Sequence, residues 1–459
     1  MNRVQRLQPS SQKSSHEASA WNLSTEIESE ITTLAAICQA RHQQRAPLGT
    51  NVDGDVKSAE SAGDEQMHCD RQPSTSIAAS LTEEGTTSVK MRFLDRLAET
   101  LCYKKDPHYV TCTAMQETAD EVNILALRNA RWGEKDIELL EEVARQLELV
   151  ANRKPFGIEI LPDLQAMLSE YYTPRLHYHA SQLLDLVVEK KEMRKLVACL
   201  KAFDSGEISS TILVSIIYDI CYSTTFYSEI NRLFTDKQVK RLVRELGFLC
   251  RPKYAYNTFW EAAREIEGFQ SMKITLVPGA KARHVPPSIS LCPQSSTKAD
   301  QKVRLELRKK KWIHAEMGMV THLISKDSVA QTFAYLGISK KTCLMCGHIL
   351  QSLGLFQARN NHGKVYSQWT LPSSLIIPSS HQGKLDPAVQ SLRDMLRHEC
   401  AVKDDQHLDA VKESTISTPV APKTAEWSPF CRHIPDPRSE ARQAEWLSTS
   451  SSRAIAHNR

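Results

Sequence analysis

The chain has 459 residues, of which 41% are hydrophobic and 24% charged. At about 150 residues per domain, this length predicts two to three domains. The 16 Gly and 20 Pro residues are too few for a collagen-like or low-complexity protein. The formal net charge of +4 does not by itself indicate a nucleic-acid partner.

Twelve cysteines are scattered along the chain, whereas secreted disulfide scaffolds are short and dense in cysteine. The N-terminus lacks the apolar stretch of a secretory signal. No run approaches the roughly 18 apolar residues of a membrane span. We therefore expect an intracellular protein, cytoplasmic or nuclear, with reduced thiols and no membrane partner.

The first 270 residues divide by composition. Residues 1–90 are rich in Ser, Thr, Gln and Glu, which predicts a mostly disordered N-terminal tail because little apolar surface can be buried. Apolar residues at helical spacing over 24–41 predict a docking helix or nascent structure, and we favour the second. Residues 91–270 show apolar stripes typical of packed helices, for example over 137–151, and predict a helical domain.

Two features of this helical region invite other interpretations. His177 and His179 resemble a metal-binding pair, but side chains two residues apart on a helix point to different faces. We therefore expect two structural or surface histidines. Residues 209–222 are dense in β-branched side chains and predict a buried helix or a strand. The sequence names no protein partner for this region.

The pattern changes near residue 271, where strand-like and helical segments begin to alternate. Such alternation predicts an α/β layer architecture over residues 271–400. Residues 356–372 predict a strand or a hairpin that turns at Gly363, and residues 401–459 a disordered C-terminal tail. The expected strands are 272–279, 303–312 and 331–339, and the expected helices are 313–324, 343–354 and 386–398.

Two short motifs in this last domain carry metal chemistry. His314 and Glu316 form an H-x-E motif, and Cys343 and Cys346 form a C-x-x-C motif. One imidazole and two thiolates fill three corners of a zinc site and leave the fourth open, as in catalytic zinc sites. Zinc lowers the pKa of a bound water toward neutrality. Glu316, near the start of the same helix as His314, is positioned to transfer that water's proton.

The two cysteines are also expected to open a helix after a strand, where helix N–H groups stabilise thiolates. The alternative is a structural zinc site, which requires a fourth protein ligand. His322, His348 and Cys400 are the candidates for that ligand.

The paired motifs resemble the zinc-dependent cytidine deaminase-like superfamily, which includes nucleoside, tRNA and polynucleotide deaminases. More narrowly, the segments HAEMGMVTHL, YLGISKKTCLMCG and NNHGKVYSQWTLP resemble a branch found largely in fungal proteins. The resemblance covers residues 271–400. It implies a three-layer α/β/α domain, His314, Cys343 and Cys346 as zinc ligands, and Glu316 as the proton shuttle.

The sequence departs from the superfamily pattern at Thr342, where proline is common before the first cysteine. Threonine can still start a helix by capping it with its hydroxyl group. The departure weakens the transfer of substrates from the better-known subfamilies.

After the zinc motifs, Asn361 and His362 are candidate substrate-binding residues, since Asn can read a base edge. Their alternative is ordinary turn chemistry. Trp369 can stack on a base or lie in the core. The basic run 308–311 can bind phosphate, but a charge run is more often a solvated edge.

Together these features predict an α/β three-layer deaminase-like domain preceded by a mostly helical domain and flanked by disordered termini. We expect a zinc-dependent hydrolytic deaminase acting on a nucleobase in a nucleoside, nucleotide or nucleic acid, such as RNA or single-stranded DNA. The alternative is a non-catalytic zinc-binding scaffold or interaction module. The sequence leaves cytosine versus adenine open.

Overall fold

The computed structural model describes residues 3–6, 18–45, 83–104, 106–118, 121–152, 162–291 and 297–401. The disorder expected for residues 46–82 and 402–459 lies outside these residues. Those described form two compact units. The sheet unit comprises described residues of 3–102, 106–151 and 261–401, and the helical unit comprises those of 103–104 and 152–260.

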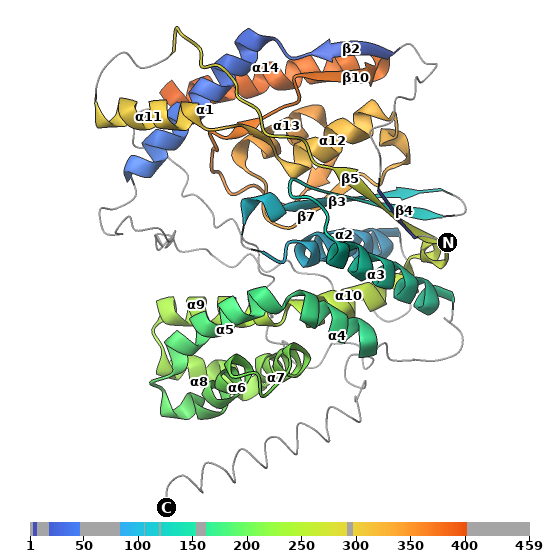
Figure 1. The fold of residues 1–459 in the computed structure, drawn as a ribbon, viewed down its shortest axis with the longest axis vertical. Helices are drawn as coiled ribbons and strands as arrows, with labels where there is room; N and C mark the ends of the chain where they lie inside the picture. Colours follow the sequence, from blue (N-terminus) through green and yellow to red (C-terminus); the bar gives the residue numbers. More distant parts are fainter. Residues whose placement is uncertain are drawn as a thin grey trace, which may run out of the picture. The chain divides into compact units, whose positions relative to one another are not determined.

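A mixed β-sheet lies at the centre of the sheet unit (Figure 1). Its strand order is β1-β5-β4-β3-β7-β8. β3 runs antiparallel to both of its neighbours, with Ala114 opposite Leu125 of β4 and Cys112 opposite Ile338 of β7, whereas the other pairs are parallel. The strands are β1 Val4–Arg6, β3 Thr111–Glu117, β4 Val122–Arg128, β5 Met272–Pro278, β7 Tyr335–Ile338 and β8 Gln357–Ala358.

Helices cover both faces of this sheet. In Figure 1, α12 and α13 lie on one face, and α2 and α3 lie on the other. The period-two alternation of β3 explains this, because its side chains point to opposite faces in turn. Cys112 and Ala114 join the core shared with α12 and α13, whereas the Thr113 hydroxyl donates to the Leu94 carbonyl of α2 at 2.8 Å. The helices are α2 Glu83–Leu101, α3 Glu134–Asn152, α12 Ala315–Ser325 and α13 Leu344–Leu353.

The N-terminal segment forms part of the sheet unit. β2 (Ala18–Asn22) pairs antiparallel with β10 (Ser374–Pro378), and α1 (Thr25–Arg45) contacts α11 (Lys298–Arg308) and α14 (Ser379–Ala401). The expectation of nascent structure over residues 24–41 is therefore wrong. The helix is stable because its apolar face is buried in the core, with Ile31, Leu34, Ala35 and Cys38 all at most 4% exposed.

The helical unit contains the helices expected between residues 162 and 260. Residues 209–222 form a helix, not a strand. His179 is buried and His177 is exposed, so the two side chains face different surroundings, as their spacing predicts. The elements are α4 Pro162–Tyr171, α5 Thr173–Val187, η3 Lys191–Met193, α6 Arg194–Asp204, α7 Ser210–Tyr222, α8 Thr224–Leu233, α9 Asp236–Leu249 and residues 251–260 of α10, which spans Arg251–Glu265.

The α/β class is confirmed, as are the strands expected near 272–279 and 331–339 and the helices near 313–324, 343–354 and 386–398. The expected helical domain over 91–270 differs from the structure. β3 and β4 lie within that range and pair in the middle of the sheet that also contains β5 and β7. The sheet unit therefore begins well before residue 271. It also includes α1, which falls in the expected N-terminal tail, and α2, which begins in that tail and ends in the expected helical domain.

Two expected strands are also corrected. Residues 298–308 form helix α11, because Thr297 caps it and Val303, Glu306 and Leu307 bury one helical face. Residues 356–372 do not form a hairpin. β8 pairs with β7, whereas β9 (Trp369–Thr370) pairs with β6 (Trp312–Ile313). The turn at Gly363, with φ +72°, does occur.

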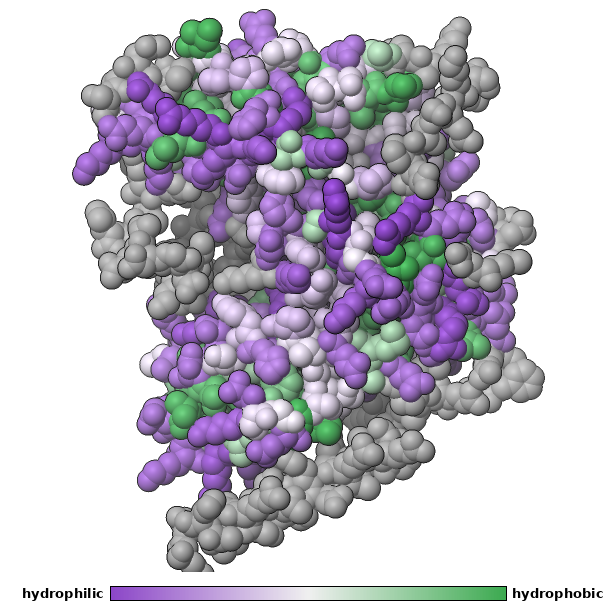
Figure 2. Space-filling model, viewed as in Figure 1, coloured by the Kyte–Doolittle hydropathy of each residue, from purple (hydrophilic) through white to green (hydrophobic). Residues whose placement is uncertain are grey.

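None of the described helices is long and apolar enough to span a membrane. Figure 2 shows one face of the molecule, on which hydrophilic residues dominate and hydrophobic residues occur in small separate groups.

Candidate metal centre

His314 lies at the junction of β6 and α12. The backbone of His314 is extended (φ −65°, ψ 153°) and forms the N-cap of α12. Because β6 pairs with β9, the strand that precedes His314 is fixed against the segment containing Trp369. The imidazole is therefore placed by a strand end and a helix start together.

Cys343 and Cys346 occupy the start of α13, which follows β7. Cys343 is the N-cap, and its Sγ accepts a hydrogen bond from the Cys346 backbone N–H at 3.3 Å. The expected capping role of Thr342 is therefore wrong, because the sulfur of Cys343 occupies that role. The carbonyl of Thr342 instead accepts from the His362 backbone N–H at 3.0 Å.

The two motifs converge at the starts of the two helices. The His314 Nδ1 lies 3.6 Å from the Cys343 Sγ and 3.5 Å from the Cys346 Sγ, and the three ligand atoms all lie within 4.8 Å of one another. A tetrahedral site with Zn–N near 2.0–2.1 Å and Zn–S near 2.3 Å separates nitrogen and sulfur by about 3.6 Å. The donor set and its spacing therefore fit a zinc ion.

The charges in this cluster already favour a thiolate. Burial acts to raise the pKa of Cys343, but the hydrogen bond from Cys346 and the charge of His314 lower that pKa well below its ordinary value. Burial and the adjacent Cys343 sulfur raise the pKa of Cys346. Burial acts to lower the pKa of His314, but the Cys343 thiolate raises it above its ordinary value. A divalent cation here would stabilise both sulfurs as thiolates.

Glu316 lies in the first turn of α12 and is 3% exposed. Burial raises the pKa of its carboxyl group, and its electrostatic interactions with His314 and Cys343 place it beside the cluster. The Oε2 atom is buried and has no hydrogen-bond partner among the described residues. A buried oxygen without a partner is costly unless a ligand, a water or a catalytic role explains it.

The structure also tests the proposed fourth ligands. Within the described residues, the group of close metal-ligand side chains consists of His314, Cys343 and Cys346. His348 hydrogen-bonds to Ser391 at 2.9 Å, and the Cys400 Sγ lies 3.0 Å from the Cys38 Sγ. His322 is outside the group as well. Three candidate protein ligands, without a fourth close to them among the described residues, are the number found in catalytic zinc sites.

The segment that follows α13 lies against the cluster. Asn361 is exposed, and its Oδ1 accepts the Gly363 backbone N–H at 3.1 Å, which is turn chemistry. His362 is 3% exposed, and its Nδ1 accepts from the Lys364 backbone N–H at 3.1 Å. These bonds shape the turn, and the role of both residues in substrate binding stays a prediction.

Tyr366 was missed by the sequence interpretation. Its ring centroid lies 5.8 Å from the rings of both His314 and His362, edge-on to each. It is half-buried. A lone tyrosine in a loop carries no local sequence signal for such a place.

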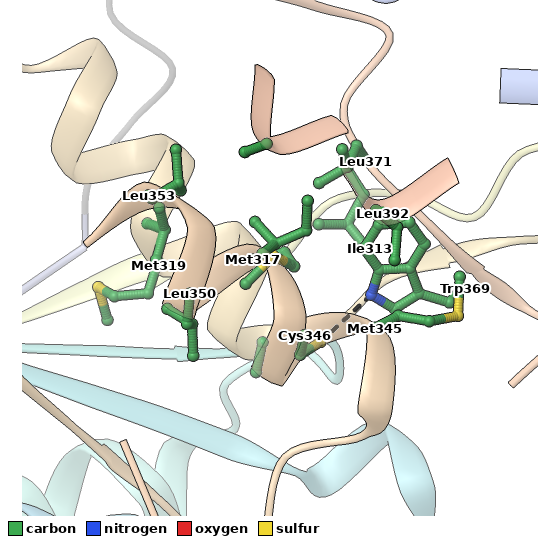
Figure 3. Packing of buried hydrophobic residues seen from close by; sticks show 14 of the residues in the cluster. Ile313, Met317, Met319, Met345, Cys346, Leu350, Leu353, Trp369, Leu371 and Leu392 are labelled. Atoms are coloured by element: carbon green, nitrogen blue, oxygen red, sulfur yellow. Dashed lines mark hydrogen bonds between the residues drawn. The ribbon is translucent and has the colours of Figure 1, made fainter. Parts of the chain in front are cut away.

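Trp369 lies in the core, which was one of the two interpretations that the sequence allowed. Its side chain is 1% exposed, and its indole N–H donates to the Cys346 Sγ at 3.2 Å (Figure 3). The surface needed for stacking on a base is therefore covered by protein.

Two residues of the basic run 308–311 form interactions within the protein. The Lys311 side chain is fully buried, with its Nζ donating to the Glu306 carbonyl at 3.1 Å. Lys309 forms an ion pair with the Glu306 carboxylate at 2.6 Å. Arg308, Lys309 and Lys310 are exposed, so Lys311 is the residue of this run that is withdrawn from solvent.

Comparison with known proteins gives the class of this site. Residues 313–373 match the family model described as "OTT_1508_deam:-like deaminase", which belongs to the cytidine deaminase-like clan. The matched segment contains both motifs, the turn at Gly363 and Trp369. The chain therefore carries a deaminase-family segment, and its resemblance to the cytidine deaminase-like superfamily is confirmed. No curated protein and no solved structure matches the chain significantly.

Proposed function

We propose that the sheet unit is a zinc-dependent hydrolytic deaminase that acts on a nucleobase in a nucleoside, nucleotide or nucleic acid. One observation carries the proposal most directly. The three ligand atoms converge at 3.5–3.6 Å next to Glu316, whose buried Oε2 has no partner among the described residues. A purely structural zinc site has no use for such a carboxylate.

In this proposal, His314 Nδ1 and the sulfurs of Cys343 and Cys346 hold the metal. Zinc, when bound, supplies a water of lowered pKa. Glu316 takes a proton from the attacking water and delivers protons to the base and its leaving amino group. Water is consumed, a carbonyl replaces the amino group on the ring, and ammonia leaves. A base within a polynucleotide must be single-stranded or flipped out of a duplex to react.

The loop beside the cluster supplies the proposed substrate contacts. Asn361 offers an amide at the exposed side of the turn. Tyr366 offers a ring near His314, and His362 offers a ring on another side of Tyr366. Hydrogen bonding and stacking are the interactions by which deaminases read a displaced base.

The test is a mass-spectrometric screen of the zinc-loaded full chain against nucleosides, RNA and single-stranded DNA. We expect wild type to convert an amino-bearing base to its keto form. Glu316→Gln should retain zinc and lose at least about 100-fold in rate, since general acid–base catalysis contributes about 10²–10⁴-fold. Glu141→Gln, at an exposed position on α3, should match wild type.

Two outcomes would contradict the proposal. Full activity of the zinc-loaded Glu316→Gln variant would remove Glu316 from the mechanism. A zinc-loaded wild type that deaminates none of the three substrate classes would favour the non-catalytic scaffold.

A further inference from the structure

The buried indole N–H of Trp369 donates a hydrogen bond to Cys346, one of the proposed metal ligands. The Nε1 lies 3.2 Å from the Cys346 Sγ, and the two side chains are 1% and 0% exposed (Figure 3). Indole N–H is a donor without acceptor capacity, and a hydrogen bond to an ionised acceptor is about twice as strong as a neutral one. The contact is therefore best satisfied when Cys346 is a thiolate.

The position of Trp369 is fixed by pairing with the strand that leads to His314. Trp369 lies opposite Trp312, and Thr370 lies opposite Ile313, in the parallel β6–β9 pair. The residue after Ile313 is His314 itself. One short pair of strands therefore aligns both the imidazole ligand and the donor to the Cys346 ligand.

Side chains from two further helices hold the same segment at Ser367. The Gln39 side chain of α1 accepts the Ser367 backbone N–H at 2.5 Å. The Ser367 hydroxyl donates to the buried Glu306 carboxylate of α11 at 2.6 Å. These contacts hold the segment that carries Trp369 from several elements. An indole held in this way loses little conformational entropy when Cys346 binds a metal, which is the usual reason for supporting the partner of a metal ligand.

We propose that Trp369 is a positioning residue of the metal centre, which orients the Cys346 thiolate and strengthens its hold on the metal. The inference rests on the zinc site of the proposed function. Outer-shell partners of metal ligands typically contribute about 10–100-fold to metal affinity. Without the indole donor, the buried thiolate would keep its charge but lose a hydrogen bond that offsets its desolvation.

The competing explanation is that Trp369 only fills space in the core. Replacing N–H by sulfur, with benzothienylalanine at position 369, keeps the bicyclic shape and removes the donor. Trp369→Phe removes the donor together with part of the volume. Phe356→Leu, at a 5%-exposed position of the same core, is the control for lost packing.

The experiment uses the full chain loaded with Zn²⁺ for affinity, by chelator competition, and with Co²⁺ for absorption spectra. We expect both position-369 variants to bind Zn²⁺ about 10-fold or more weakly than wild type. Their thiolate-to-Co²⁺ charge-transfer band should move to lower energy, since the sulfur lone pair is no longer stabilised by the N–H. Phe356→Leu should keep the wild-type affinity and spectrum even where its thermal midpoint falls.

The benzothienylalanine variant decides between the two explanations. Wild-type affinity and spectrum in that variant would overturn the positioning role, and so would equal changes in Phe356→Leu. Failure of wild type to bind either metal would overturn the metal site and this inference together. Metal binding by wild type without any deamination would contradict the proposed function alone, and the role of Trp369 would stand.

Discussion

At the scale of single residues, Lys311 shows how the segment before His314 is anchored. Its side chain is fully buried, and its Nζ donates to the Glu306 carbonyl at 3.1 Å. Burial lowers the pKa of Lys311 to about 8 from an ordinary value of 10.5, partly offset by the Glu306 charge. The folded protein thus binds this proton more weakly than the unfolded chain does.

This difference predicts how stability depends on pH. Between about pH 8 and 10.5, the unfolded chain keeps a proton that the folded chain has lost, so the free energy of unfolding rises with pH. The lysine contributes about 2 to 3 kcal/mol to that rise. Lys311→Met should remove this part of the slope and stabilise the protein at pH 7. Urea titrations from pH 7 to 10.5 measure the free energy of unfolding of both proteins and its slope with pH.

The matched control is Lys310→Met, at the exposed neighbouring position. It should keep the wild-type slope, because it leaves the buried Lys311 side chain in place. Equal slopes for wild type and Lys311→Met would contradict the prediction.

At the scale of elements, β7 and α2 approach each other closely in the described core. Gly337 of β7 lies under Leu94 of α2, where an added Cβ would come within 2.3 Å of the Leu94 carbonyl carbon and 2.5 Å of the Thr113 hydroxyl. Nearby, the Arg359 guanidinium forms ion pairs with Asp95 at 2.7 Å and with Glu99 of the same helix. Helix α2 is therefore tied to the sheet by both packing and charge.

Gly337→Ala should destabilise the sheet unit by about 3 kcal/mol or more, because the added methyl group meets backbone atoms that cannot rotate away. Gly383→Ala is the control. This glycine lies in helix α14, and nothing lies within 4 Å of an added Cβ. It should be neutral or stabilising by up to about 1 kcal/mol, from helix propensity. Denaturant unfolding of both variants measures this difference. Equal free energies of unfolding for the two variants would contradict the prediction.

The helices also show which sequence patterns predicted the secondary structure correctly. The helices that carry the two motifs were predicted because apolar periodicity and strand ends are local features. Helix α11 was missed because Val303, Leu305 and Leu307 alternate like a strand. In the structure Leu305 is 59% exposed, whereas Val303 and Leu307 are buried with Glu306. The buried Glu306 carboxylate accepts a hydrogen bond from the Ser367 hydroxyl, 61 residues further along the chain. No local sequence pattern reveals such a distant partner.

At the scale of the whole molecule, the sheet is built from distant parts of the chain. β3 and β4 lie between β5 and β7, although they precede β5 by more than a hundred residues. Helix α1 contacts α11 and α14 from the other end of the sequence. The metal centre therefore depends on residues far outside the matched deaminase segment.

A fragment of residues 271–401 should consequently fail to fold. It lacks the two central strands, so β5 loses β4 and β7 loses β3. It also lacks the core side chains that those strands supply to α12 and α13. We expect no cooperative thermal transition by circular dichroism and no stoichiometric zinc binding, whereas the full chain should show both. A cooperative transition with bound zinc in the fragment would contradict this division of the chain.

The sequence by itself predicted the candidate metal centre. The types and spacing of His314, Glu316, Cys343 and Cys346 are local, and local signals place them at helix starts. Only the tertiary structure decided that Trp369 donates to Cys346 and that α1, β3 and β4 belong to the same unit as the site. The reason is physical, because these outcomes depend on burial and hydrogen bonding between segments far apart in the chain.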